Sequence, residues 1–76
     1  MLEREVKIGS TYRHFKGHVY VVMGVGKDAD TLEEKVVYQN VDNKDIWIRG
    51  KDDFLSLVDR KKYPDVNQEY RFELIN

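Results

Sequence analysis

The sequence contains no cysteine, a single proline and no long apolar run. Without cysteine the chain can form neither disulfides nor thiolate zinc sites, and nothing favours an oxidising compartment. No stretch approaches the ~20 apolar residues of a membrane span, and the charged first residues differ from a secretory signal. We therefore predict a cytoplasmic protein without membrane contacts, and no cofactor is indicated.

A strong excess of charge of either sign is also missing. Thirteen basic and fourteen acidic residues give a formal charge of −1, so no overall field attracts phosphate backbones or anionic membranes. Net charge therefore does not support nucleic-acid binding. Residues 13–18 and 60–62 lean positive, and the simplest interpretation is two solvated turns, because Lys and Arg side chains are mostly exposed.

The length of 76 residues indicates a single domain, residues 1–76. A chain this short buries only about 60% of its unfolded surface, which leaves no apolar surface for a second core. Since no disulfide can supplement this core, we expect its stability to be modest.

Residues 12–24 predict a first β-hairpin. The run at residues 19–23 is rich in β-branched and aromatic side chains, which suit a half-buried strand. Lys16 and Gly17 supply a two-residue turn, in which the glycine accepts a positive φ. The cross-strand pairs are then Tyr12 with Val21, Arg13 with Tyr20, and Phe15 with His18.

The rest of the chain predicts further strands and one helical turn. Glycines at 24 and 26 indicate a bend that lets a small sheet curl. The expected strands span residues 35–41, 46–49 and 70–74, and the expected helical turn lies within residues 51–57, which brings Phe54 and also Leu57 onto the core. Residues 1–10 either add an edge strand or pack against the barrel.

Alternation predicts which side chains share a face. In the strand at residues 46–49, Ile46 and Ile48 lie on one face, with Trp47 and Arg49 on the other. The final strand is expected to bury Tyr70, Phe72 and Leu74.

These elements indicate an all-β fold, a small SH3-like barrel of about five strands with one short helical turn. An open antiparallel sheet with a packed helix is the alternative.

Several motifs resemble the domain-of-unknown-function 1653 family, and the similarity covers nearly the whole chain. They are residues 12–17, Tyr20, Gly24, residues 31–33 and 36–39, residues 47–49, Phe54, and Arg71-Phe72. The resemblance implies a small, mostly bacterial protein with an SH3-like barrel and no established activity. Members of the family often carry a polar residue at the position of Val21, which favours Tyr20 and Val22 as the core-facing residues. Because Tyr12 pairs with Val21 in the expected hairpin register, Tyr12 and His14 then lie on the outer face. Three features depart from the family pattern, namely a loop without histidine at residues 28–31, Gly50 in place of proline, and Asp53 in place of methionine.

Metal binding and catalysis have little support in the sequence. His14 and His18 are the only histidines, and the expected hairpin register places them on opposite faces, so they do not form a metal site. No motif activates Ser10 or Ser56 as a nucleophile. We therefore predict neither a catalytic nor a metal site, and expect that the protein is not an enzyme.

Aromatic and basic residues form the most informative set. Aromatic rings in a small barrel mostly fill the core, but rings and a guanidinium on one face can also form a binding groove. On that second interpretation the ligand-binding residues are Tyr12, Arg13, His14, Tyr38, Trp47 and Arg49.

Three functions follow as hypotheses. The first is a non-catalytic binding module for a protein segment, with nucleic acid less favoured. The second is a small-molecule-binding or minor enzymatic domain that fixes an anion with His14 and Arg49. The third is a structural accessory subunit whose strand edges dimerise, so that the protein is either a monomer or a weak homodimer.

Overall fold

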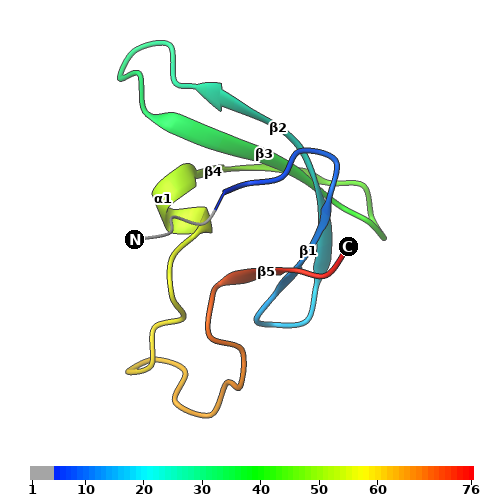
Figure 1. Ribbon diagram of the computed structural model, residues 1–76, viewed down its shortest axis with the longest axis vertical. Coiled ribbons are helices and arrows are strands. Elements are labelled where there is room, and N and C mark those ends of the chain that lie inside the picture. Colours follow the sequence, from blue (N-terminus) through cyan, green and yellow to red (C-terminus); the bar gives the residue numbers. More distant parts are fainter. Residues whose placement is uncertain (1–4) are drawn as a thin grey trace.

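Five antiparallel strands and one short helix make up the fold in the computed structural model, which describes residues 5–76 (Figure 1). The strands lie in one sheet in the order β4-β3-β2-β1-β5. Their bounds are β1 Thr11–His14, β2 Val19–Lys27, β3 Glu34–Asn40, β4 Ile46–Gly50 and β5 Phe72–Leu74, and the helix α1 is Lys51–Phe54.

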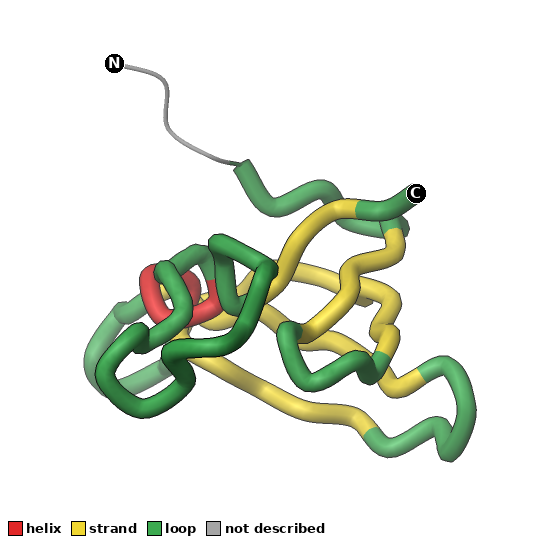
Figure 2. Tube along the Cα trace, turned by 90° about the horizontal axis from the view of Figure 1, so that it is seen from below, coloured by secondary structure: helices red, strands yellow, loops and turns green. Residues whose placement is uncertain are grey.

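The predicted all-β class, with five strands and one short helical turn, is confirmed. The sheet is bent but not closed into a barrel, because β4 and β5 remain its two edges. An irregularity in the β2–β3 register between Val22 and Gly24 contributes to the bend. Helix α1 and the long loop of residues 55–71 gather beside the strands (Figure 2).

The β1–β2 turn has three residues instead of the expected two. The amide of His14 donates to the carbonyl of His18 (2.8 Å), and Gly17, with a φ of 100°, closes the turn by donating to the carbonyl of His14 (2.8 Å). Tyr12 therefore pairs with Tyr20, not with Val21. Because the register moves by one residue, the predicted placement of His14 and His18 on opposite faces is wrong, and both lie on the same face.

The same change of register places Tyr12 in the core, with only 1% of its surface exposed. The prediction that Tyr12 lies on the outer face is therefore wrong. Its hydroxyl still has a partner, because it accepts a hydrogen bond from the amide of Lys7 (2.9 Å). The buried cluster around it consists of Tyr12, Val22, Val36, Tyr38, Phe54 and Phe72.

Helix α1 carries one aromatic ring into the centre of this core. Phe54 is fully buried, stacks on Phe72 with ring centroids 4.2 Å apart, and meets the edge of Tyr12 at 5.3 Å. The predicted helical turn and the burial of Phe54 are confirmed, whereas Leu57 stays 57% exposed because the helix ends at Phe54.

The chain ends depart from the predicted pattern. β5 is shorter than the predicted strand, and Tyr70 contributes only an isolated bridge to Leu57. Phe72 is buried as expected, but Leu74 is exposed at the end of the sheet. Residues 5–10 form no strand, and Val6 packs against the core from the side; the part of the predicted segment at residues 1–4 lies outside the described residues.

Candidate functional site

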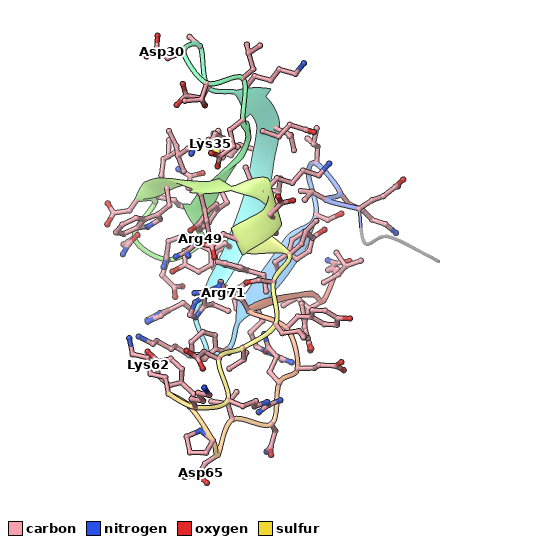
Figure 3. The ribbon with its side chains drawn as sticks, turned by 90° about the vertical axis from the view of Figure 1, so that its left-hand side faces the viewer. Asp30, Lys35, Arg49, Lys62, Asp65 and Arg71 are labelled. Carbon is pink, nitrogen blue, oxygen red and sulfur yellow. The ribbon has the colours of Figure 1, made fainter. Side chains whose placement is uncertain are left out.

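A pocket of about 240 Å³ opens where the β1–β2 turn, β4 and the loop of residues 55–71 meet. We call it the basic pocket. Figure 3 shows Arg49, Arg71 and Lys62 following one another down the same side of the molecule. The lining residues are His14, Phe15, Lys16, Arg49, Asp59, Lys62, Tyr63 and Arg71.

Positive charge dominates this lining. Four cationic side chains face a single carboxylate, that of Asp59. The cations come from positions far apart in the chain, and the fold brings them together around one concave surface. A concave site concentrates the field of its charges, so it favours an anion over a neutral group.

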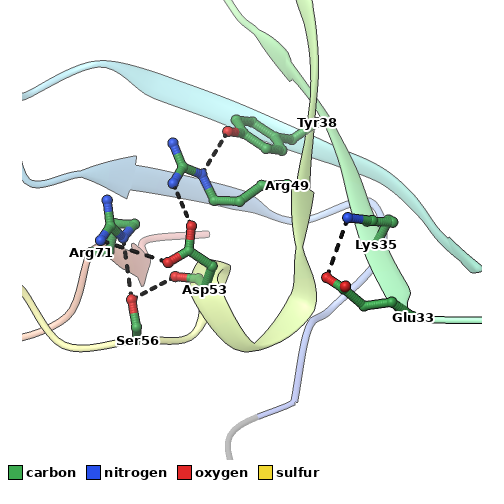
Figure 4. A network of polar contacts seen from close by, with 7 residues as sticks. All are labelled: Glu33, Lys35, Tyr38, Arg49, Asp53, Ser56 and Arg71. Atoms are coloured by element: carbon green, nitrogen blue, oxygen red, sulfur yellow. Dashed lines mark hydrogen bonds and ion pairs between the residues drawn. The ribbon is translucent and has the colours of Figure 1, made fainter. Parts of the chain in front are cut away.

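Two of the cations, Arg49 and Arg71, are fixed by Asp53 (Figure 4). Its carboxylate lies 2.8 Å from Nη1 of Arg49 and 3.8 Å from Nη2 of Arg71. Arg71 Nε also donates to the hydroxyl of Ser56 (3.2 Å), which in turn donates to the carbonyl of Asp53 (2.6 Å). One carboxylate shared by two guanidinium groups leaves a net positive charge on a pre-oriented pair.

Arg49 is held on its other side by the core. Its Nε donates to the hydroxyl of Tyr38 (3.2 Å), and its guanidinium lies 5.8 Å from the ring centre of Phe72. Burial alone lowers the pKa of Arg49, but the hydrogen bonds with Tyr38 and Asp53 outweigh burial and raise it. These contacts therefore favour the charged form of Arg49.

His14 contributes a neutral imidazole to the pocket. Burial, followed by the positive charges of Arg49, Arg71 and Lys16, lowers the pKa of His14 from 6.5 to about 4. Its Nδ1 accepts a hydrogen bond from the amide of Lys16 (3.1 Å), so the neutral ring carries its proton on Nε2. His14 is thus a hydrogen-bond donor that adds no charge at neutral pH.

This depressed pKa makes folding stability depend on pH. In the unfolded chain the pKa of His14 returns to 6.5, so the unfolded state takes up a proton that the folded state does not bind until about pH 4. Stability is therefore fully present above pH 6.5 and declines as the pH falls toward 4. Because the ring is partly exposed, we expect a loss of about 1 kcal/mol.

Unfolding by urea at several pH values measures this effect. The variant His14→Gln retains a side-chain acceptor but cannot titrate, so its free energy of unfolding is expected to fall less steeply between pH 6.5 and pH 4. Equal slopes for the two proteins would show that His14 binds protons equally in the folded and unfolded states.

Aromatic rings form the opposite wall of the pocket. The rings of Phe15 and Tyr63 lie 4.8 Å apart, and His14 stacks on Phe15 at 4.3 Å. The ammonium of Lys16 lies 5.5 Å from the ring centre of Tyr63, and that of Lys62 lies 5.7 Å from it. Cation–π contacts of this kind keep the lysine ammonium groups near the pocket.

The structure brings together only part of the predicted ligand-binding set. His14 and Arg49 line the pocket, and Tyr38 orients Arg49. Tyr12 belongs to the core instead. Arg13 points elsewhere and donates to Gln68 (3.3 Å), while Trp47 does not line the pocket.

Sequence reasoning did not assign Asp53 to the site, and it missed six of the residues that line the pocket, namely Phe15, Lys16, Asp59, Lys62, Tyr63 and Arg71. A signal was present for the lysines, because residues 13–18 and 60–62 are the two basic stretches of the chain. Each stretch taken alone is an ordinary solvated turn, and only the tertiary structure shows that both border one pocket.

Two other kinds of site are missing from the described part of the chain. No three His, Cys, Asp or Glu side chains within residues 5–76 gather so that they could hold a metal ion. Over the same residues, no helix has the length and apolar character needed to cross a membrane.

A comparison with known protein families matches residues 10–74 to a family described as a protein of unknown function, DUF1653. Every residue that lines the basic pocket lies within this matched range. No curated protein and no solved structure gives a significant match to the chain.

Proposed function

The chain belongs to the DUF1653 family, whose function is unknown, and from the geometry of its site we propose that it is a non-catalytic module that binds an anionic group in the basic pocket. The observation that carries this proposal is the pair of guanidinium groups, Arg49 and Arg71, held by the single carboxylate of Asp53. Guanidinium groups oriented in advance bind carboxylate or phosphate oxygens with little further loss of entropy.

The neighbouring groups complete an anion site. Lys16 and Lys62 add charge at the rim, and His14 adds a neutral donor through Nε2. Several donors line one small volume, so an anion bound there accepts charge-assisted hydrogen bonds from more than one of them. The predicted anion-fixing pair of His14 and Arg49 thus belongs to a set of five donors, which also includes Lys16, Lys62 and Arg71.

The same chemistry supports binding over catalysis. With a pKa of about 4, His14 is a weak base at neutral pH, whereas general bases work best with a pKa near the operating pH. The hydroxyl of Ser56 donates to the Asp53 carbonyl and accepts from Arg71, so no base is positioned to take its proton.

An anionic side chain or phosphate on a protein segment fits this site better than a nucleic acid. The pocket receives one group, whereas nucleic-acid backbones are followed by extended basic surfaces. The overall charge of −1 also opposes binding to a polyanion. We therefore propose that the partner is a protein segment and that the module works in the cytoplasm.

A nuclear magnetic resonance titration of the labelled protein tests this proposal. The ligands are inorganic phosphate, a phosphoserine peptide and a single-stranded oligonucleotide. Amide shifts are expected to gather at residues 14–16, 49 and 71, with tighter binding of the phosphopeptide than of either other ligand. Tighter binding of the oligonucleotide would contradict the choice of a protein partner, and absence of shifts with all three would contradict anion binding.

A matched pair of lysine variants tests the location of the site. Lys62→Gln removes a cation that lines the pocket, whereas Lys61→Gln removes a neighbouring exposed cation that does not. We expect Lys62→Gln to weaken phosphate binding roughly three- to tenfold, about one partly screened charge interaction, and Lys61→Gln to have little effect. Equal losses in the two variants would indicate a diffuse attraction instead of a pocket.

A further inference from the structure

The outer edge of β4 exposes three large apolar side chains in succession. Ile46, Trp47 and Ile48 are 55%, 51% and 67% exposed. Alternation along the strand is as predicted, with Trp47 opposite Tyr38 and Ile48 opposite Val37 on the neighbouring strand. Within residues 5–76, β3 is the only strand that pairs with β4, so its far edge stays open. An open, apolar edge is a template for another strand.

Main-chain groups on this edge point outward at alternate residues. The amide of Asn40 donates to the carbonyl of Asp45 (2.9 Å), so Asp45 directs that carbonyl toward β3. In an antiparallel pair the direction alternates with each residue. Trp47 therefore also faces β3 with its main chain, whereas Ile46 and Ile48 direct their amide and carbonyl groups away from the sheet.

The residue pattern of the strand is complementary to itself. Residues 45–49 read Asp-Ile-Trp-Ile-Arg, which is symmetric in its apolar residues about Trp47 and opposite in charge at its two ends. An antiparallel pair of two such strands places Trp47 against its own counterpart and Ile46 against Ile48 of the second copy. Asp45 then lies at the same end as Arg49 of the second copy.

We propose that the edge of β4 pairs with β4 of a second copy of this chain, giving a dimer with a two-fold axis through Trp47. In this register the outward groups of Ile46 and Ile48 hydrogen-bond across the axis, and the tryptophan rings meet at a non-hydrogen-bonded pair, where side chains lie closest. The charge pattern favours the antiparallel over the parallel arrangement, because parallel strands would align like charges. The isologous contact closes on itself and does not propagate into a fibre.

Trp47 does not line the basic pocket, but Arg49 does, so the proposed dimer contact shares one residue with the pocket. One short strand from each copy buries less than the ~1,200 Å² of a standard stable interface. The dimer is therefore weak and forms at high protein concentration.

Sedimentation equilibrium and fluorescence test the proposal on the full chain. Between about 10 μM and about 1 mM, the range expected for weak interfaces, the average mass should rise from the monomer toward twice that value. Trp47 is the only tryptophan, so its emission should move to shorter wavelength over the same concentrations. A constant monomer mass across this range would overturn the proposal.

Two lysine variants locate the interface. Ile48→Lys places a charge on the edge, and Ile8→Lys is its control, because Ile8 is similarly exposed (63%) but lies outside β4. We expect the Ile48 variant to stay monomeric at every concentration and the Ile8 variant to dimerise as the unmodified chain does. Dimerisation of both variants would overturn the assignment to β4.

A charge reversal gives a second, independent test. Asp45 is exposed and directly precedes β4, outside the core. Asp45→Lys places a positive charge opposite Arg49 of the second copy. We expect the dissociation constant of the dimer to rise severalfold, with recovery in high salt because exposed charges are screened. An unchanged dissociation constant would contradict the antiparallel register.

Discussion

Phe54→Ala is expected to lower the free energy of unfolding by about 3–5 kcal/mol, the cost of truncating a buried phenylalanine. Phe54 is fully buried and contacts the rings of Tyr12, Tyr38 and Phe72. A domain of this length has a total stability of roughly 4–11 kcal/mol. At the lower end of this range, the variant loses much or all of its folded population.

Urea unfolding followed by circular dichroism measures this loss. Leu57→Ala is the matched control from the same segment, since its side chain is 57% exposed, and we expect a change within about 0.5 kcal/mol. If both substitutions cost the same, helix α1 would not anchor the core as described.

Arg49→Gln is expected to weaken anion binding about 10- to 100-fold, because a hydrogen bond to a charged group contributes about 1.5–3 kcal/mol. Arg49 combines a charge on the pocket with fixed contacts to Tyr38 and Asp53. Arg13→Gln is its control, because Arg13 is an arginine outside the pocket that pairs with Gln68. Calorimetric titration with phosphate separates the two, and equal losses would contradict a specific site.

Asp53→Asn is expected to strengthen anion binding, whereas Arg49→Gln weakens it. Asp53 supplies the negative charge that an incoming anion must share with Arg49 and Arg71. The asparagine amide keeps the shape of the side chain but carries no charge. Phosphate binding should therefore tighten about three- to tenfold, which corresponds to a Coulomb term of about 1 kcal/mol. If Asp53→Asn weakens binding instead, the loss of its positioning contacts to the two arginines outweighs the charge that it withdraws from them, and the predicted sign is wrong.

Local sequence patterns predicted the elements of the fold well because their signals are short-range. The β-branched run of β2, the alternation in β4 and the helical turn that carries Phe54 each depend on neighbours in the chain. The predicted hairpin register was wrong because the register changes when the turn gains one residue. Gly17 permits either turn, and only the three-residue form places Tyr12 inside.

The candidate site was predicted only in part for a different reason. His14 and Arg49 were identified as a pair, but the partners that define the pocket lie far along the chain, in the loop of residues 55–71. This loop has no periodic pattern from which a register could be derived. Only tertiary contacts therefore show that Arg71 and Lys62 belong to the site, and the same holds for Asp53, which lies between Arg49 and Arg71.

The pKa of the His14 imidazole, followed by nuclear magnetic resonance with and without sulfate, shows whether the basic pocket binds an anion. Sulfate keeps its charge over the titration, so only the protein changes protonation. We predict a pKa of about 4 in the free protein and a higher value with sulfate, because a bound anion offsets the positive charges of Arg49, Arg71 and Lys16. A pKa near 6.5 that sulfate leaves unchanged would contradict both the cationic character of the pocket and its role as an anion site.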